Sequence, residues 1–187
     1  MSSGESRGSV LAALPVFHAE IDRIASRLSA RHGDRLQCRR GCNACCLDDL
    51  TVTAVEAERI QDHHGDWLAR AAPHPDGACA FLDGAGACRI YSDRPSVCRS
   101  QGLPLRVLFE DENEEIVERR DICPLNLEGG PALGELPEDA FWLVGPHELR
   151  LAELDRRFAE SLGSTALPRV ALRSLFRTRG IARTEGD

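Results

Sequence analysis

The chain has 187 residues, a formal net charge of −7, and 42% hydrophobic and 28% charged residues. A chain of this length can bury enough surface to fold without covalent cross-links, so its eight cysteines need another explanation. The acidic balance argues against broad nucleic-acid binding, which requires a cationic face. All 23 basic residues are arginine, which excludes Schiff-base lysine chemistry and a lysine-dependent phosphate-binding loop.

No segment has the pattern of a targeting or membrane-spanning sequence. The first ten residues lack a basic region, and the apolar run over residues 10–17 is short and contains Pro15. No apolar stretch approaches the ~20 residues that span a bilayer. We therefore expect a cytoplasmic protein without membrane contact. Disulfides are rare in that compartment, and clustered cysteines there usually indicate metal binding or catalysis.

The first half of the chain predicts two helices. Apolar residues at helical spacing predict an amphipathic helix over about residues 15–31, with His18 on the surface. Thr53 and Glu56 have the capping-box spacing, which predicts a second helix that runs to about His63.

The middle of the chain predicts two hairpins and a short helix. Residues 79–82 and 88–91 flank a turn sequence at 83–86, which favours a small hairpin. A short helix is expected after Asp93, with Pro95 in its first turn. A second hairpin is predicted from residues 105–109 and 115–119.

These elements predict an α+β fold. We expect a small, irregular, cysteine-rich metal-binding core with short β-hairpins, flanked by N- and C-terminal helices. The predicted division is a flexible N-terminus over residues 1–14, a cysteine-cluster domain over 15–125 and a helical extension over 126–187. Helices are expected in this extension over residues 137–143, 146–162 and 167–179, with Gly163 and Gly180 closing the last two. The extension carries no cysteine, so we assign it to packing or to contact with a protein partner.

Four of the eight cysteines lie within nine residues, at Cys38, Cys42, Cys45 and Cys46. The two-residue spacer between Cys42 and Cys45 lets two thiolates reach one metal from a single turn. Cys38 lies one turn upstream, so three sulfur atoms can converge. Neighbouring side chains usually diverge, and Cys46 is therefore expected to serve a different metal atom or a second centre.

The remaining ligands are expected from later segments. Cys79 and Cys88 bracket the first predicted hairpin, which would bring their sulfur atoms together. Cys98 lies on the short helix that follows. Cys123 is isolated before Pro124, and the sequence leaves open whether it is a ligand. Ligands drawn from a loop, a hairpin and a helix would give the metal a structural role.

Alternatives to metal binding are weaker. Buried free cysteines, disulfides and a redox dithiol at Cys42 and Cys45 each explain part of the pattern. All-sulfur sites suit both zinc and iron–sulfur clusters. Structural zinc usually occurs with two separate CxxC pairs, whereas this chain has one such pair and several scattered cysteines. The pattern favours an iron–sulfur cluster, with [4Fe-4S] as the expected type, and Zn²⁺ remains the alternative.

Arginines gather in the same segment. Thiolates and metal leave a site net negative, so these guanidinium groups are expected to balance charge or form salt bridges. The alternative is that they bind an anionic substrate. The arginines concerned are Arg39, Arg40, Arg89, Arg94 and Arg99.

The segment resembles the YkgJ-like cysteine cluster proteins, a family of zinc- or iron-chelating domains. The matching text is CRRGCNACC from Cys38, CAFL from Cys79 and CRIYSDRPSVCR from Cys88, which together fall within about a third of the chain. The resemblance implies iron–sulfur or zinc chelation by Cys38, Cys42, Cys45, Cys46, Cys79, Cys88 and Cys98. It implies a supporting framework at Phe81, Tyr91, Arg94, Pro95 and Arg99.

Three functions follow. The first is metal binding with a structural or redox role. The second is an enzyme with the cluster in its active site, either an oxidoreductase or a protein lysine N-methylase, because one class of relatives resembles flagellin lysine N-methylases. The third is storage or delivery of metal. The sequence names no catalytic residue and favours the first function, since it shows no glycine-rich methyl-donor loop and no catalytic triad.

Overall fold

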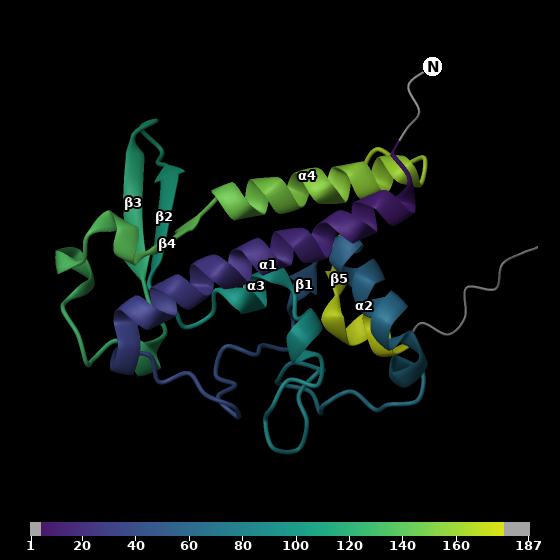
Figure 1. Cartoon of the computed structure of the whole chain (residues 1–187), viewed down its shortest axis with the longest axis horizontal. Helices are drawn as coiled ribbons and strands as arrows, with labels where there is room; N and C mark the ends of the chain where they lie inside the picture. Colours follow the sequence, from purple (N-terminus) through teal and green to yellow (C-terminus); the bar gives the residue numbers. More distant parts are fainter. Residues whose placement is uncertain (1–4, 178–187) are drawn as a thin grey trace, which may run out of the picture.

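The computed structural model describes residues 5–177 and has the predicted α+β fold. Two long helices, α1 (Arg7–His32) and α4 (Pro146–Ser161), lie side by side and run in opposite directions (Figure 1). The helix α2 (Ala54–Leu68) packs near one end of this pair. The loops that carry most of the cysteines lie on one side of the α1–α4 layer.

Helix α1 begins eight residues earlier than predicted. Ser6 caps it by accepting a hydrogen bond from the Ser9 amide at 3.2 Å, and Val10 extends the buried apolar stripe toward the N-terminus. The segment expected to be a flexible N-terminus is therefore helical from Arg7 onward.

The contact between α1 and α4 forms the larger of two apolar clusters. Leu14, Phe17 and Ile21 of α1 pack with Leu154 and Phe158 of α4, and all five are almost fully buried. Burial of a side chain of this size stabilises the fold by about 1.5–3 kcal/mol. The apolar face of α4 is therefore buried against α1.

The second apolar cluster lies beneath α2. The predicted capping box is present, with Thr53 and Glu56 at the start of the helix, which then continues five residues beyond the predicted end. Ile60 and Leu68 of α2 pack against Phe81 and Leu172. This cluster joins α2 to the cysteine-bearing segment.

Two small sheets complete the fold. Strands β2 (Leu105–Glu110) and β3 (Ile116–Asp121) form the predicted second hairpin, and β4 (Trp142–Val144) pairs with β2 in parallel. Strands β1 (Thr51–Val52) and β5 (Val170–Ala171) form the other sheet.

Two of the three predicted C-terminal helices are wrong. The first is a short 3₁₀ turn, Glu138–Ala140, followed by β4. The third is β5 and a 3₁₀ helix, Leu172–Arg177, and Gly180 lies outside the described residues. In both segments, pairing with a strand far away in the chain overrides the helical pattern. The helix predicted at residues 146–162 is confirmed as α4, and Gly163 closes it with a φ of +75°.

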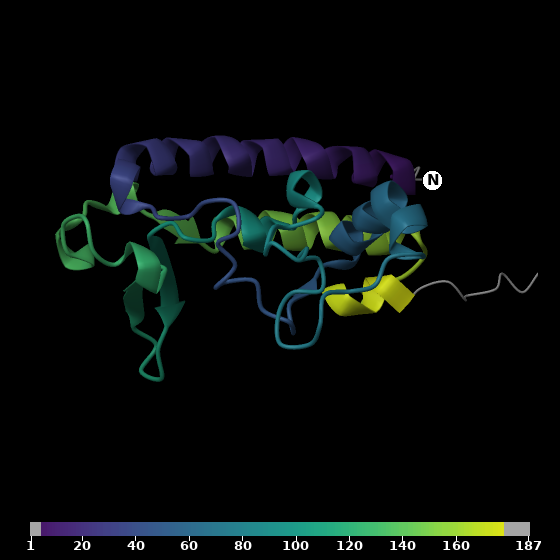
Figure 2. The same ribbon diagram turned by 90° about the horizontal axis from the view of Figure 1, so that it is seen from below.

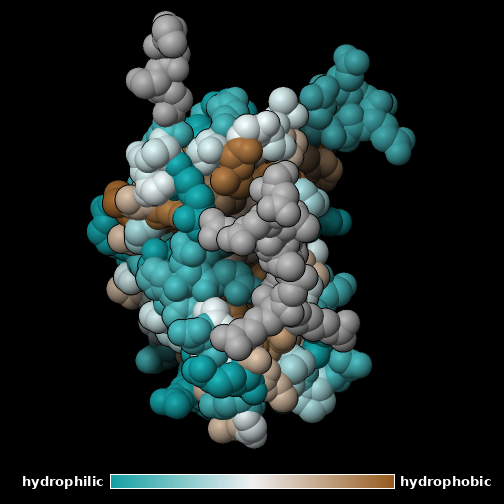
Figure 3. Space-filling view, turned by 90° about the vertical axis from the view of Figure 1, so that its right-hand side faces the viewer, coloured by the Kyte–Doolittle hydropathy of each residue, from teal (hydrophilic) through white to brown (hydrophobic). Residues whose placement is uncertain are grey.

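The β2–β3 hairpin projects from the body of the molecule (Figure 2). The surface at the opposite end, where α2 and α4 meet, has a groove lined by apolar residues such as Ala57, Phe158 and Leu162. Figure 3 faces this end of the molecule and shows apolar side chains at the surface between hydrophilic ones. No cysteine lines that groove. Over residues 5–177, no helix is long and apolar enough to cross a membrane.

Candidate metal centre

The eight cysteines lie on short, mostly irregular segments. Four are in the loop between α1 and β1. Two flank the turn at residues 83–86, one is in α3 (Ser96–Arg99), and Cys123 precedes the 3₁₀ turn Pro124–Asn126. All eight are free thiols. The first loop and the turn at 83–86 lie close together (Figures 1 and 2). The contact is so close that a Cβ atom added at Gly86 would be only 2.7 Å from Nδ2 of Asn43.

The first loop is a pair of tight turns. The amide of Cys42 donates to the carbonyl of Arg39 at 2.9 Å, and the amide of Cys46 donates to the carbonyl of Asn43 at 2.8 Å. Gly41, the third residue of the first turn, has a φ of +87°, a conformation that favours glycine.

Asn126 holds Cys38 in place. Nδ2 of this fully buried asparagine lies 3.4 Å from Sγ of Cys38 and donates to the carbonyl of Gly102 at 2.7 Å. Its Oδ1 accepts from the amide of Gln37 at 2.7 Å. Burial raises the pKa of the Cys38 thiol and the Asn126 hydrogen bond opposes that rise, while the charges of Cys42 and other nearby thiolates add to it.

A second group of thiols is more deeply buried. The amide of Cys79 donates to the carbonyl of Cys46 at 2.9 Å. Cys79 is a buried member of the apolar cluster beneath α2, and the partly buried Cys46 and Cys88 pack against that cluster. The predicted first hairpin is reduced to its turn and one bridge between Leu82 and Cys88. Burial raises the pKa of the Cys98 thiol to about 12, and the charges of Cys79 and Cys88 contribute.

The neighbouring Cys45 and Cys46 thiols influence each other, which lowers the pKa of Cys45 to about 6 and raises that of Cys46. Both residues end the tight turn that begins at Asn43, where the backbone is not that of a regular strand. The assignment of Cys46 to a different metal atom from Cys45 stays a prediction.

The donor set fits a thiophilic metal in its chemistry, because separate segments of the chain supply eight unpaired thiols. Among residues 5–177, however, no three His, Cys, Asp or Glu side chains are arranged to hold an ion as they stand. The pKa values of Cys38, Cys79, Cys88 and Cys98 are raised. Metal binding would therefore release protons and draw the loops together.

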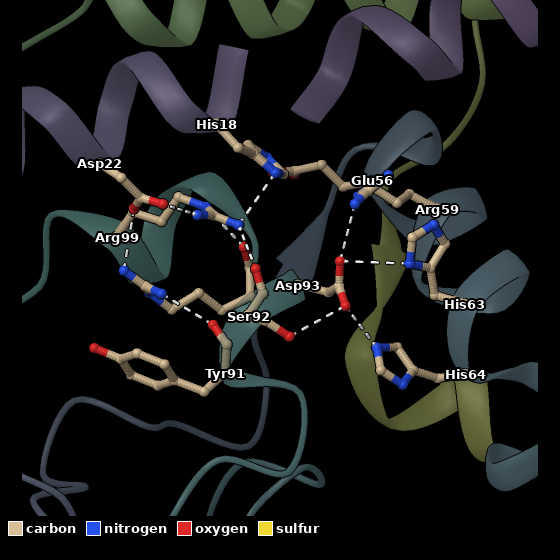
Figure 4. A network of polar contacts seen from close by, with 11 residues as sticks. His18, Asp22, Glu56, Arg59, His63, His64, Tyr91, Ser92, Asp93 and Arg99 are labelled. Carbon is tan, nitrogen blue, oxygen red and sulfur yellow. Dashed lines mark hydrogen bonds and ion pairs between the residues drawn. The ribbon is translucent and has the colours of Figure 1, made fainter. Parts of the chain in front are cut away.

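The arginines after Cys88 support the backbone around the thiols. Arg89 donates to the carbonyls of Ala72 and Ala80 and stacks on Trp67, with its guanidinium carbon 4.7 Å from the ring centroid. Arg94 and Arg99 both pair with Asp22 of α1. Figure 4 shows Asp22 beside Arg99. The salt-bridge interpretation is confirmed for these two side chains.

Sequence reasoning missed a buried polar network that joins α1, α2 and the segment before Cys98. His18 was expected on the surface but is buried, 3.2 Å from Arg99 and 3.4 Å from Glu56 (Figure 4). Glu56 also accepts from the Ser96 amide at 2.7 Å. Burial alone would raise the pKa of Glu56, but hydrogen bonds from His18 and Ser96 outweigh it and keep that pKa below its usual range.

The same network continues through Asp93. Its carboxylate pairs with Arg59 at 3.0 Å and His64 at 3.0 Å, and with His63 at 3.6 Å. These contacts hold the 3₁₀ turn Tyr91–Asp93 against α2. The one available sequence signal was the four-residue spacing of His18 and Asp22, which puts both side chains on one face of α1.

Comparison with known proteins identifies the cysteine-bearing segment. Residues 37–124 match the CxxCxxCC family model, described as "Putative zinc- or iron-chelating domain". This CxxCxxCC segment covers slightly less than half of the chain and includes all eight cysteines. The match supports metal binding in general, and its description names both zinc and iron. Searches of curated proteins and of solved structures found no match.

Proposed function

We propose that the chain binds an iron–sulfur cluster through thiolates of the CxxCxxCC segment, with a structural or redox role. The supporting observation is the supply of free thiols from four separate segments that lie close together. The proposed ligands are Cys38, Cys42, Cys45, Cys46, Cys79, Cys88, Cys98 and Cys123. The proposal requires a reducing compartment such as the cytoplasm, where thiols stay unpaired.

Iron–sulfur is favoured over zinc by the distribution of these thiols. Structural zinc sites usually take two CxxC pairs, whereas this segment has one pair and ligands contributed singly by later elements. A bound cluster would supply one-electron chemistry. The chain itself supplies the N–H donor of Asn126 beside Cys38 and a largely apolar surround at Cys79 and Cys88. Both influence the potential of a cluster.

The test is metal and sulfide analysis of protein purified without air, together with its visible absorbance. We expect iron and sulfide in comparable amounts and a brown colour. Zinc without sulfide would overturn the cluster and leave metal binding in place. Neither metal, with the cysteines joined pairwise, would overturn the function.

A pair of variants in the first loop separates loss of a ligand from disturbance of the loop. Cys42→Ser removes a proposed ligand and should lower the metal content. Ala44→Ser adds the same hydroxyl group to the same exposed loop and should leave the metal content unchanged. Equal metal content in both variants would remove Cys42 from the ligand set.

A further inference from the structure

The distal half of the β2–β3 hairpin leaves large apolar side chains in water. Leu108, Phe109 and Ile116 are 43%, 45% and 70% exposed, and none of them belongs to either apolar cluster. The register of the strands puts Phe109 opposite Val117 on one face, and Leu108 and Ile116 are diagonal neighbours on the other. Apolar side chains therefore gather on both faces of the same short ribbon, and contiguous exposed apolar surface of this kind marks interaction sites.

The rest of the molecule does not cover this part of the hairpin. Strand β4 pairs only with residues 105–107 of β2, so beyond Val107 this edge of β2 has no neighbouring strand in the part of the chain that the structure describes. Leu105 packs against the larger apolar cluster, and Arg120 donates to the carbonyl of Leu133. The base of the hairpin is thus fixed to the body, whereas its distal half projects away from it (Figure 2).

The tip of the hairpin carries a concentrated negative charge. Five of the six residues 110–115 are acidic and none is basic. Asp111 closes the turn by accepting hydrogen bonds from the amides of Asn113 and Glu115. The other four carboxylates are exposed, and the ion pairs that Glu118 forms with two arginines lie below the tip. The charge at the tip is therefore open to a cationic partner.

Glu114 contributes to this charge from an unfavourable backbone conformation. Its φ is +62°, and between residues 5 and 177 it is the only residue other than glycine with a positive φ. Glycine and asparagine adopt this conformation more easily than glutamate does. A carboxylate thus stands at a position where local stability alone would favour glycine.

We propose that the distal half of the β2–β3 hairpin is a docking surface for a second protein, which offers an apolar groove bordered by lysine or arginine side chains. The exposed apolar residues supply contact area on both faces, and the acidic residues around them select a cationic partner. Nucleic acid and anionic lipid are repelled by the same carboxylates, and two copies of the chain that met tip to tip would bring like charges together. Residues 108–117 include no cysteine, so the docking surface is independent of the proposed metal binding.

The first experiment identifies the partner by photo-cross-linking in the cells that produce the protein naturally. The full chain carries the change Phe109→benzoylphenylalanine, and Val16→benzoylphenylalanine, on the exposed side of α1, is the control. We expect a cross-linked product that forms only from position 109, through a peptide with more lysine and arginine than acidic residues. The proposal is overturned by no product beyond the control, by a product joined to a second copy of the chain, or by an acidic peptide.

The second experiment measures the affinity of the purified full chain for the partner protein that the cross-link identifies. Ile116→Ser removes apolar contact area and should weaken binding about tenfold. Leu149→Ser, at a position on α4 that is 72% exposed, is the matched control and should bind like the unaltered chain. Equal affinity of the two variants overturns the docking surface.

A third measurement tests the charge and does not depend on how Ile116→Ser folds. The double variant Glu112→Gln and Glu114→Gly loses two carboxylates and relieves the unfavourable φ of residue 114, so its melting temperature should not fall. Its affinity for the same partner should be several-fold weaker at low salt, and the difference should shrink as salt is added. Unchanged affinity at low salt overturns the selection of a cationic partner. The metal content of the double variant should equal that of the unaltered chain, because the tip lies outside the cysteine-bearing loops.

Discussion

The α1–α4 layer and the loop from residue 36 to residue 50 are organised in contrasting ways. In the layer, Leu14 and Phe17 of α1 pack with Phe158 of α4, and all three side chains are almost fully buried. The loop contains no helix, no strand and no fully buried residue, and it carries half of the cysteines. The layer is stable because it removes apolar area from water. In the loop only Leu36, Cys46 and Leu50 pack against an apolar cluster, so most of its order must come from hydrogen bonds to neighbouring segments and, by the proposed function, from a metal.

This contrast implies that the two regions respond to different changes. Removal of apolar volume should destabilise the layer whether or not metal is present. Removal of single polar contacts or of metal should affect the cysteine-bearing loops first, while α1 and α4 keep their helical structure.

The largest effect is expected from Phe158→Ala, which opens a cavity between α4 and α1. A Phe→Ala change at a buried position typically costs about 3–5 kcal/mol. Urea denaturation of metal-loaded and metal-free protein should show a similar loss in both. Val16→Ala, at a position that is 70% exposed, is the control and should leave the unfolding midpoint unchanged. A loss of stability seen only in the metal-loaded protein would show that the α1–α4 layer depends on the metal.

A smaller loss is expected from Asn126→Ala. The change leaves the carbonyl of the buried Gly102 without this partner, at about 1–3 kcal/mol, and also removes the acceptor of the Gln37 amide. It also removes the donor to Cys38, so metal content should fall with stability. Asn113→Ala, at the exposed hairpin tip, is the matched control for denaturation and metal analysis. Full metal content in Asn126→Ala would show that Cys38 does not need this contact.

The next effect in size concerns Gly102, where an added Cβ would collide with Sγ of Cys38. Its φ of +89° adds a strain of roughly 1–2 kcal/mol for any other residue. Gly163→Ala carries a similar strain at a φ of +75° but meets no atom within 4 Å. Gly102→Ala should therefore lose more thermal stability than Gly163→Ala and should lower metal content. Identical behaviour of the two variants would mean that Cys38 moves aside freely.

The smallest loss is expected from Glu56→Gln; it is present in full at neutral pH and should shrink on acidification. Because the pKa of Glu56 is lowered in the folded state, its stabilisation is complete above the unfolded value of about 4.3. It is lost as the pH falls through the folded value. Urea denaturation of metal-free protein at several acidic pH values should show a steeper decline for the unaltered chain than for Glu56→Gln. If the stability of both proteins falls equally as the pH is lowered, protonation of Glu56 is not the cause of the acid destabilisation.

The sequence predicted the elements that local pattern specifies. Helical periodicity and the Thr53–Glu56 capping box located α1 and α2, and turn residues located the β2–β3 hairpin. Strands β4 and β5 were missed, because each depends on a partner strand far away in the chain rather than on its own residues. The helical pattern of these segments does not outweigh such pairing.

The candidate site was predictable to the same extent. Cysteine spacing grouped Cys38, Cys42 and Cys45, and the RPSVCR text located α3. The contacts of Asn126 with Cys38 and of His18 with Glu56 join residues 88 and 38 positions apart. Neither contact leaves a periodic signal in the sequence.

Asn126 lies outside the segment that matches the family model. The family match ends at residue 124, yet the donor to Cys38 lies two residues later, and the partner of Arg94 and Arg99 is Asp22 on the first helix. Residues outside the matched segment therefore provide part of the contacts that support it. Excised on its own or grafted into a foreign protein, it would need substitutes for both supports, and different hosts would be expected to tune the same thiols differently.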